Sequence, residues 1–179
     1  MIIHDNAYEW IKTKVYNSID HVITDFPYGT EFPFDSLMMI TKGNIITFCS
    51  DTDYPFEPTE KAYWIKTPST KNYSKHLGRF VEHIFIHRPE DSVFNAGLHW
   101  SQYIGVYTDL VEEPNGHQWQ KPTSLMERLV KIYTKPGDIV LDPFCGSGQT
   151  LKACKNLGRR YIGVDIDKKW VDYCKERYG

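Results

Sequence analysis

The chain has 179 residues, of which 41% are hydrophobic and 25% are charged, a composition typical of a folded domain with one hydrophobic core. Its apolar runs are short and its first residues show no secretory pattern, so we expect no membrane span and a cytoplasmic location. The formal net charge of −2 argues against a protein that coats nucleic acid, although it allows a local basic surface.

Short apolar or β-branched runs predict strands, and amphipathic spacing predicts helices between some of them. The predicted strands are residues 1–3, 21–24, 44–48, 62–65, 82–86, 138–141 and 160–164. The predicted helices are residues 7–15, 123–133, 149–157 and 168–177, with Val15 on the apolar face of the first and Thr123 as the N-cap of the second. This alternation favours a single α/β domain over residues 1–179, with a mostly parallel sheet and helices on both faces.

The predicted strand 21–24 ends at the tetrapeptide Asp25-Phe26-Pro27-Tyr28, and the carboxyl ends of parallel strands are where such sheets bind ligands. The Asp25 carboxylate and the Phe26 carbonyl are suited to accept both hydrogens of an exocyclic amino group, which localises its lone pair for attack. Pro27 stiffens the turn, and Tyr28 offers a flat face on which a flipped base can stack. The alternative is a simple turn that ends the strand.

The segment 61–88 carries six Lys or Arg residues and one acidic residue, Glu82. Residues 67–78 within it are polar and predict a mobile loop. A solvated surface is the alternative to a nucleic-acid contact, but the local excess of positive charge around an aromatic residue favours the contact. The residues that we expect to contact DNA are Lys66, Lys71, Tyr73, Lys75 and Arg79.

A second motif lies near the end of the chain, where the predicted strand 138–141 is followed by Asp142 and by a turn containing Gly146 and Gly148. Glycines let a backbone approach a ligand, and the helix start that follows offers unpaired N–H groups. The next strand ends at Asp165, an acid suited to ribose hydroxyls. The turn lacks the third glycine of the dinucleotide fingerprint, and Asp142 would repel a pyrophosphate. A cationic ligand such as S-adenosylmethionine is therefore favoured over a simple tight turn.

The four cysteines Cys49, Cys145, Cys154 and Cys174 are scattered and form no Cys-x-x-Cys pair, and the seven histidines show no ligand spacing beside them. We therefore expect buried free thiols in a reducing compartment and no metal site.

In this order, the motifs resemble the amino-group DNA methyltransferases that methylate adenine N6 or cytosine N4, and most closely the permuted beta group. There an Asp-Pro-Pro-Tyr motif precedes the recognition region and the cofactor motif comes last. The early Ile3-His4-Asp5-Asn6 and the later Gln120-Lys121-Pro122 resemble further motifs of the group. The resemblance implies a Rossmann-like methyltransferase sheet with circularly permuted motif order, and S-adenosyl-L-methionine as cofactor.

The resemblance also implies a role for each matching residue. The catalytic residues would be Asp25, Phe26, Pro27 and Tyr28. The cofactor would contact Asp5, Lys121, Pro122, Asp142, Phe144, Gly146, Gly148 and Asp165. The expected substrate is double-stranded DNA within a restriction-modification system, with a homodimer as an open alternative to a single subunit.

Four features depart from the group's pattern. Phe26 replaces the usual first proline, Gln149 stands where threonine is usual, and Asp165 stands where glutamate is frequent. The region available for sequence recognition, about 96–117, is very short, so it would read few base pairs or rely on a second subunit.

Several functions stay open on the sequence alone. Adenine N6 is favoured, because the cytosine N4 enzymes typically carry serine where this chain has Asp25. Cytosine N4 methylation is the first alternative. RNA or protein-glutamine methyltransferases share a similar tetrapeptide, but their cofactor motif normally comes first. A catalytically silent binding module is the remaining alternative, and Phe26 is the residue that encourages it.

Overall fold

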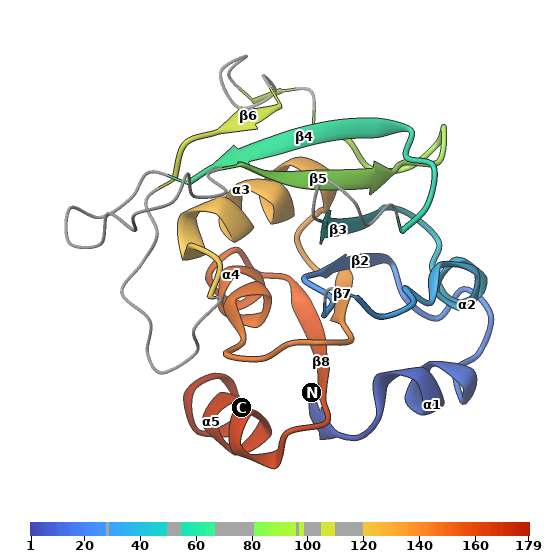
Figure 1. The fold of residues 1–179 in the computed structure, drawn as a ribbon, viewed down its shortest axis with the longest axis vertical. Coiled ribbons are helices and arrows are strands. Elements are labelled where there is room, and N and C mark those ends of the chain that lie inside the picture. Colours follow the sequence, from blue (N-terminus) through green and yellow to red (C-terminus); the bar gives the residue numbers. More distant parts are fainter. Residues whose placement is uncertain (28, 50–54, 67–80, 96, 99–104, 110–119) are drawn as a thin grey trace.

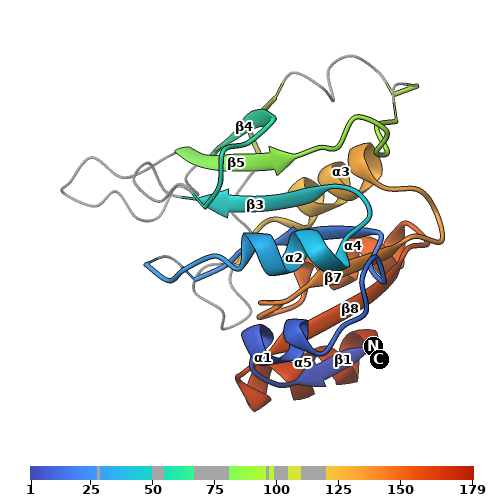
Figure 2. The same ribbon diagram turned by 90° about the vertical axis from the view of Figure 1, so that its right-hand side faces the viewer.

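The computed structural model describes residues 1–27, 29–49, 55–66, 81–95, 97–98, 105–109 and 120–179. Figures 1 and 2 show one twisted sheet with helices on both faces. The strands are β1 (Ile2–His4), β2 (His21–Thr24), β3 (Ile45–Cys49), β4 (Glu60–Ile65), β5 (Val81–His87), β6 (Val106–Tyr107), β7 (Ile139–Asp142) and β8 (Arg160–Asp165). The helices are α1 (Ala7–Lys12), α2 (Phe34–Ile40), α3 (Thr123–Tyr133), α4 (Gln149–Asn156) and α5 (Lys168–Tyr178).

The strand order is β1-β8-β7-β2-β3-β5-β4-β6. In the first five of these, β1, β8, β7, β2 and β3, each strand is parallel to its neighbours within the five. Strand β5 runs antiparallel to both β3 and β4, while the short β6 is parallel to β4. The expectation of an α/β fold with a mostly parallel sheet is confirmed. The parallel half brings the carboxyl ends of β1, β8, β7 and β2 to one edge, where ligands bind in such sheets.

Both faces of the central strands are buried, because successive side chains of a strand point to opposite faces. Val22 and Ile45 pack with α1 and α2, whereas Ile23 and Ile46 pack with α3 and α4. All four side chains are fully buried. A third cluster joins α5 and α4 to β1. This two-sided burial explains why the central strands appear in the sequence as continuous apolar runs.

The ends of two predicted helices differ from the expectations. Helix α1 ends at Lys12, and Val15 is 75% exposed, because the chain leaves the helix and turns through Asn17 with a φ of 52°. Pro122 rather than Thr123 occupies the N-cap of α3, so no side chain caps that helix. The hydroxyl of Thr123 instead donates to the side chain of Gln149 at the start of α4.

The expected burial of the four cysteines is confirmed, and each of them is a thiol outside any disulfide. Among the described residues, no helix has the length and apolar character needed to cross a membrane. The polar loop 67–78 and most of the recognition region 96–117 lie outside the described residues.

Candidate functional site

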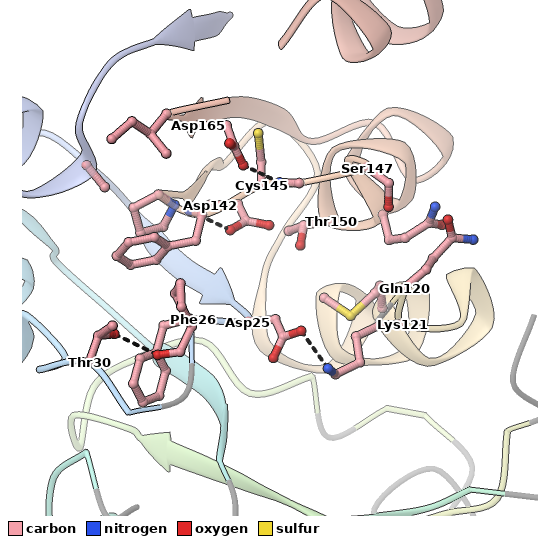
Figure 3. Close-up of a pocket in the computed structure, with 18 of the residues that line it drawn as sticks. Asp25, Phe26, Thr30, Gln120, Lys121, Asp142, Cys145, Ser147, Thr150 and Asp165 are labelled. Atoms are coloured by element: carbon pink, nitrogen blue, oxygen red, sulfur yellow. Dashed lines mark hydrogen bonds and ion pairs between the residues drawn. The ribbon is translucent and has the colours of Figure 1, made fainter. Parts of the chain in front are cut away.

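Three acidic residues gather at the carboxyl edge of the parallel strands. Asp25 follows β2, Asp142 ends β7 and Asp165 ends β8, and these three strands are neighbours in the sheet. All three line a cavity of about 920 Å³, which Figure 3 shows in close-up. Residues 25–27 and the glycine turn therefore line one cavity at the carboxyl edge of the parallel strands, where such sheets bind ligands.

Asp142 is the most buried acid of the cavity, with 3% exposure. Burial raises the pKa of its carboxyl to about 6, although hydrogen bonds from Thr150, Thr24 and the Phe144 N–H lower it in part. Thr24 donates at 2.7 Å and the Phe144 amide at 3.2 Å, both to Oδ1. These donors are neutral, so the ionised carboxylate brings uncompensated negative charge to this wall of the cavity, which favours a cationic ligand.

Asp165 is fixed by two backbone amides. Its Oδ2 accepts a 2.7 Å hydrogen bond from Gly146 and its Oδ1 accepts a 2.8 Å bond from Asp167. The bond to Gly146 joins the end of β8 to the turn after β7, and both residues line the cavity. Each carboxylate oxygen has two lone pairs, so these bonds orient Asp165 and leave it acceptor capacity for ligand hydroxyls.

The second glycine of the turn has a different part. Gly148 is the N-cap of α4 with a φ of 79°, and a Cβ there would lie 2.7 Å from the Cys174 sulfur of α5. A side chain is thus excluded by the backbone conformation and by the packing of α5. Gly148 does not belong to the described cavity lining, so its observed role is to shape the turn.

The ring of Phe26 packs in an aromatic cluster. Phe26 is 3% exposed, and its ring lies 4.8 Å from that of Phe32, centroid to centroid. Phe56 extends the cluster, with its ring 6.0 Å from Phe32. The side chain at position 26 therefore belongs to the core, while Phe26 also reaches the cavity lining. The carbonyl of Pro27 accepts a 2.6 Å hydrogen bond from the Thr30 hydroxyl, which ties the turn together.

A row of alternating charges borders Asp25. The ammonium of Lys121 lies 2.5 Å from Asp25 Oδ2 and 3.1 Å from Glu82 Oε2, and Lys66 pairs with the other oxygen of Glu82. Burial alone would lower the pKa of Lys121, but the carboxylates of Asp25 and Glu82 raise it above its ordinary value. Lys121 is therefore a buried cation, and Figure 3 shows it reaching toward Asp25.

Helix α1 supplies the remaining wall. Tyr8 lies edge-on to Phe144 with ring centroids 5.7 Å apart, and its hydroxyl donates a 2.7 Å bond to the Glu31 carbonyl. Asn6 caps the helix and also lines the cavity. Its neighbour Asp5 does not belong to the lining; the Asp5 carboxylate accepts from the Asn6 amide.

The structure thus brings most of the predicted residues together. Those that line the cavity are Asp25, Phe26, Pro27, Lys66, Lys121, Asp142, Phe144, Gly146 and Asp165. Asp5, Gly148 and Pro122 lie outside this lining. Predictions for Tyr28, Lys71, Tyr73, Lys75 and Arg79 fall outside the described residues. Within the described part of the chain, no group of three or more His, Cys, Asp or Glu could hold a metal ion.

Sequence reasoning missed Glu82 and Tyr8 as cavity residues. Glu82 is the one acidic residue of the basic segment 61–88, and Tyr8 lies within the predicted helix 7–15, so no motif points to either as a site residue. The signal for Glu82 is its place at the start of β5. Because β5 runs antiparallel to β3, it begins at the edge of the sheet where β3 ends. That signal needs the direction of β5, which the sequence does not give.

Known proteins with similar sequences show the family of this chain. A family model described as DNA methylase, of the N6/N4 type, matches residues 99–176. The type II methyltransferase M.HpaI of Haemophilus parainfluenzae is 49% identical over 234 residues, which covers 98% of this chain and 73% of M.HpaI. The chain belongs to the N6/N4 DNA methylase family. The order of its motifs, with the tetrapeptide first and the cofactor turn last, is that of the beta group.

Solved structures of DNA methylases share the whole fold. M1.HpyAVI, solved as a complex with SAM, is 30% identical with a TM-score of 0.81, over 99% of this chain and 98% of that one. The cytosine-N4-specific PvuII DNA methyltransferase has a TM-score of 0.75 at 16% identity, over 99% and 85% of the two chains. Two other type II methyltransferases are matched over only 28% and 29% of their own length, so this chain spans less than a third of them.

Proposed function

We propose that the chain transfers a methyl group from S-adenosyl-L-methionine to the exocyclic amino group of a base flipped out of double-stranded DNA, with adenine N6 as the favoured target. The observation that carries this proposal is the shared cavity. Asp25 and Phe26, suited to hold an amino group, and Asp142 and Asp165, suited to hold a cationic nucleoside, line the same space. Membership of the DNA methylase family supports the reaction class.

The residues present fit the cofactor. Asp142 provides negative charge for a cationic ligand, Asp165 provides acceptors for ribose hydroxyls, and the Tyr8–Phe144 pair provides an aromatic wall. A cavity of about 920 Å³ has room for a nucleoside and a flipped base together. When bound, S-adenosylmethionine supplies an electrophilic methyl group on a positively charged sulfur.

At the other end of the cavity the chain's own groups prepare the amino nitrogen. The Asp25 carboxylate and the Phe26 carbonyl accept its two hydrogens, which withdraws its lone pair from the base ring and directs it at the methyl group. The aromatic anchor beneath Phe26 and the Thr30 bond to the Pro27 carbonyl fix these acceptors in advance. Preorganisation of this kind avoids the cost of reorientation during the reaction. Tyr28 stays the predicted stacking platform for the flipped base.

The choice of adenine rests on Asp25, since the cytosine N4 enzymes that the chain resembles typically have serine there. A cytosine target is the second candidate, because the cytosine-specific PvuII methyltransferase has the same fold. A cation-lined rim would bring DNA to the cavity: Lys66 lies at the edge of the described lining, and Lys71, Tyr73, Lys75 and Arg79 follow it in the sequence.

The domain organisation is also part of the proposal. We infer a single methyltransferase domain over residues 1–179 with a reduced recognition region at about 96–117. The stretch of M.HpaI that aligns with this chain is longer than the chain itself, so M.HpaI carries residues within this stretch that the chain lacks. A homodimer would supply further DNA contacts. The role fits the modification half of a cytoplasmic restriction-modification pair, as the type II name of the relatives suggests.

The test is direct. The protein is incubated with unmethylated genomic DNA and tritiated S-adenosylmethionine, the DNA is digested to nucleosides, and the label is located by chromatography. Label in N6-methyl-2′-deoxyadenosine supports the proposal as stated, and label in N4-methyl-2′-deoxycytidine supports the second candidate. Cofactor binding without transfer to DNA, RNA or protein would identify a silent module.

A further inference from the structure

Glu82 lies at the edge of the site but has no part in the reaction described so far. It is 8% exposed, at the start of β5, opposite Trp64 of β4. Strand β5 runs antiparallel to β3, so its beginning reaches the edge at which the parallel strands end. A carboxylate buried to this degree is costly unless it is paired. Its partners are Lys121 and Lys66. Lys121 also pairs with Asp25, so a single ammonium group connects the two carboxylates.

Lys121 is held in one position by its surroundings. Its ammonium lies 4.9 Å from the Phe48 ring centroid and 6.0 Å from that of Trp64. Trp64 is itself fixed, because its indole N–H donates a 3.0 Å bond to the Asp109 carbonyl. The two carboxylates and the two rings together enclose the ammonium, and the Lys121 side chain is only 6% exposed. A lysine enclosed in this way acts as a fixed charge rather than as a flexible surface side chain.

A fixed ammonium beside Asp25 has two opposing effects on methyl transfer. It holds the carboxylate in place, which assists the reaction. It also draws negative charge toward itself and so weakens Asp25 as an acceptor for the target amino group, because a cation at hydrogen-bond distance competes for the same lone pairs. A second carboxylate on the far side of the ammonium reduces this competition, since the ammonium then shares its charge between two acids.

We propose that Glu82 is a positioning residue for methyl transfer, which acts through Lys121 to fix Asp25 while leaving it a strong acceptor. The inference rests on the proposed function, since it assigns Glu82 to the same reaction. Glu82 is not expected to touch the cofactor, because both of its ion pairs are with lysines and one of these lysines joins it to Asp25. Lys66 completes the row, so that two ammonium groups balance two carboxylates.

The test is a double-mutant cycle on single-turnover methyl transfer to duplex DNA, with cofactor affinity and thermal midpoint measured for every variant. The variants are Glu82→Gln, Lys121→Met and the double variant. Glu60→Gln is the matched control, because Glu60 is an ion-paired glutamate at the other end of the β4–β5 ribbon, paired with Arg88 and outside the cavity lining. Glu82→Asp tests rescue by a shorter carboxylate.

We expect Glu82→Gln to slow transfer by up to about 10²-fold, the range for a displaced catalytic group, with unchanged cofactor affinity. In the Lys121→Met background the same change should have little further effect, because the connection to Asp25 is already cut. Glu82→Asp should recover part of the rate, and Glu60→Gln should transfer at the parental rate.

Additive effects in the cycle, or a rate loss in Glu82→Gln that only follows its thermal midpoint, would assign Glu82 to the fold alone. A parental rate in Glu82→Gln would also overturn the inference while leaving the proposed function intact. Failure of the proposed function is a separate result, since the parental protein would then transfer no methyl group at all.

Discussion

The hydroxyl of Thr24 donates a 2.7 Å hydrogen bond to Oδ1 of Asp142, across 118 residues of sequence. Thr24 is the last residue of β2 and directly precedes Asp25, while Asp142 is the last residue of β7. The bond thus fixes the wall of the cavity that carries Asp25 against the wall that carries Asp142. It also helps to keep Asp142 ionised, because a hydrogen bond to the charged form opposes the effect of burial.

This bond leads to a prediction on pH. The pKa of Asp142 is raised to about 6 in the absence of ligand, and a cationic cofactor prefers the ionised form. Affinity for S-adenosylmethionine should therefore be constant above that pH and fall as the pH drops through it. Thr24→Val removes a bond that lowers this pKa, so the loss should begin at a higher pH. Calorimetry from pH 5 to 8 would show two identical profiles if the Thr24 bond had no such role.

Asp165→Ala should weaken cofactor binding by about 1–3 kcal/mol, the cost of losing hydrogen bonds to a charged acceptor. The variant also releases the Gly146 amide, which Asp165 now fixes at 2.7 Å. Titration calorimetry measures the change. Asp172→Ala, which removes an exposed acid of α5 paired with Lys168, is the control and should bind as the parent does. Equal affinity in both variants would remove Asp165 from the cofactor site.

Asp25→Ala should lower the methyl-transfer rate by about 10²-fold or more, as the loss of other preorganised polar groups does. Cofactor affinity should stay close to the parental value, because Asp25 faces the other end of the cavity. The fold should persist, since Glu82 still pairs with Lys121. A folded Asp25→Ala protein that methylates at the parental rate would reduce the tetrapeptide to a turn.

Replacing Lys71, Lys75 and Arg79 together by glutamine should weaken binding to DNA of any sequence. The slope of log affinity against log salt should flatten by about 0.9 for each lost phosphate contact. Fluorescence anisotropy at several salt concentrations measures the slope. The control replaces Lys131, Lys155 and Lys175, three exposed lysines on α3, α4 and α5. Equal slopes in both triple variants would mark the segment as a solvated surface.

Phe26→Ala should lower the free energy of unfolding by about 3–5 kcal/mol, the usual range for the truncation of a buried phenylalanine. Its ring is buried against Phe32, so a cavity would form beneath the tetrapeptide. Chemical denaturation measures the loss. Cofactor affinity should change little at a temperature where the variant is folded. A stability equal to the parental one would contradict the role of the Phe26 ring in the core and would leave its place in the cavity lining as its function.

Local patterns predicted much of the fold and part of the site. The apolar run that became β2 and the amphipathic run that became α3 were predicted with their observed bounds. Helix α2 was missed because its apolar residues Leu37 to Ile40 are consecutive and show no helical period. Strand β6 was missed because two residues carry too little pattern.

Tertiary pairings were the part that the sequence could not supply. Lys121 was assigned to the cofactor, but its observed ion pairs join it to Asp25 and Glu82, residues that are far away in the chain. The burial of the Phe26 ring depends likewise on Phe32 and Phe56, which no local period connects to it. Ion pairs and ring contacts of this kind form when distant segments pack together in the folded sheet. The secondary-structure propensities of single residues do not predict them.

Strand β1 has a consequence for synthesis. In the described sheet it occupies an edge and pairs with β8 alone. Residues 2–4 therefore cannot form their strand pairing until residues 163–165 have been synthesised. A ribosome makes the tetrapeptide strand early and its partner β7 more than a hundred residues later. The walls of the cavity that carry Asp25 and Asp142 can therefore meet only after β7 has been made. Until then β2 has β3 on one side but lacks β7 on the other, so the partly made sheet presents an open, apolar strand edge that is prone to aggregation.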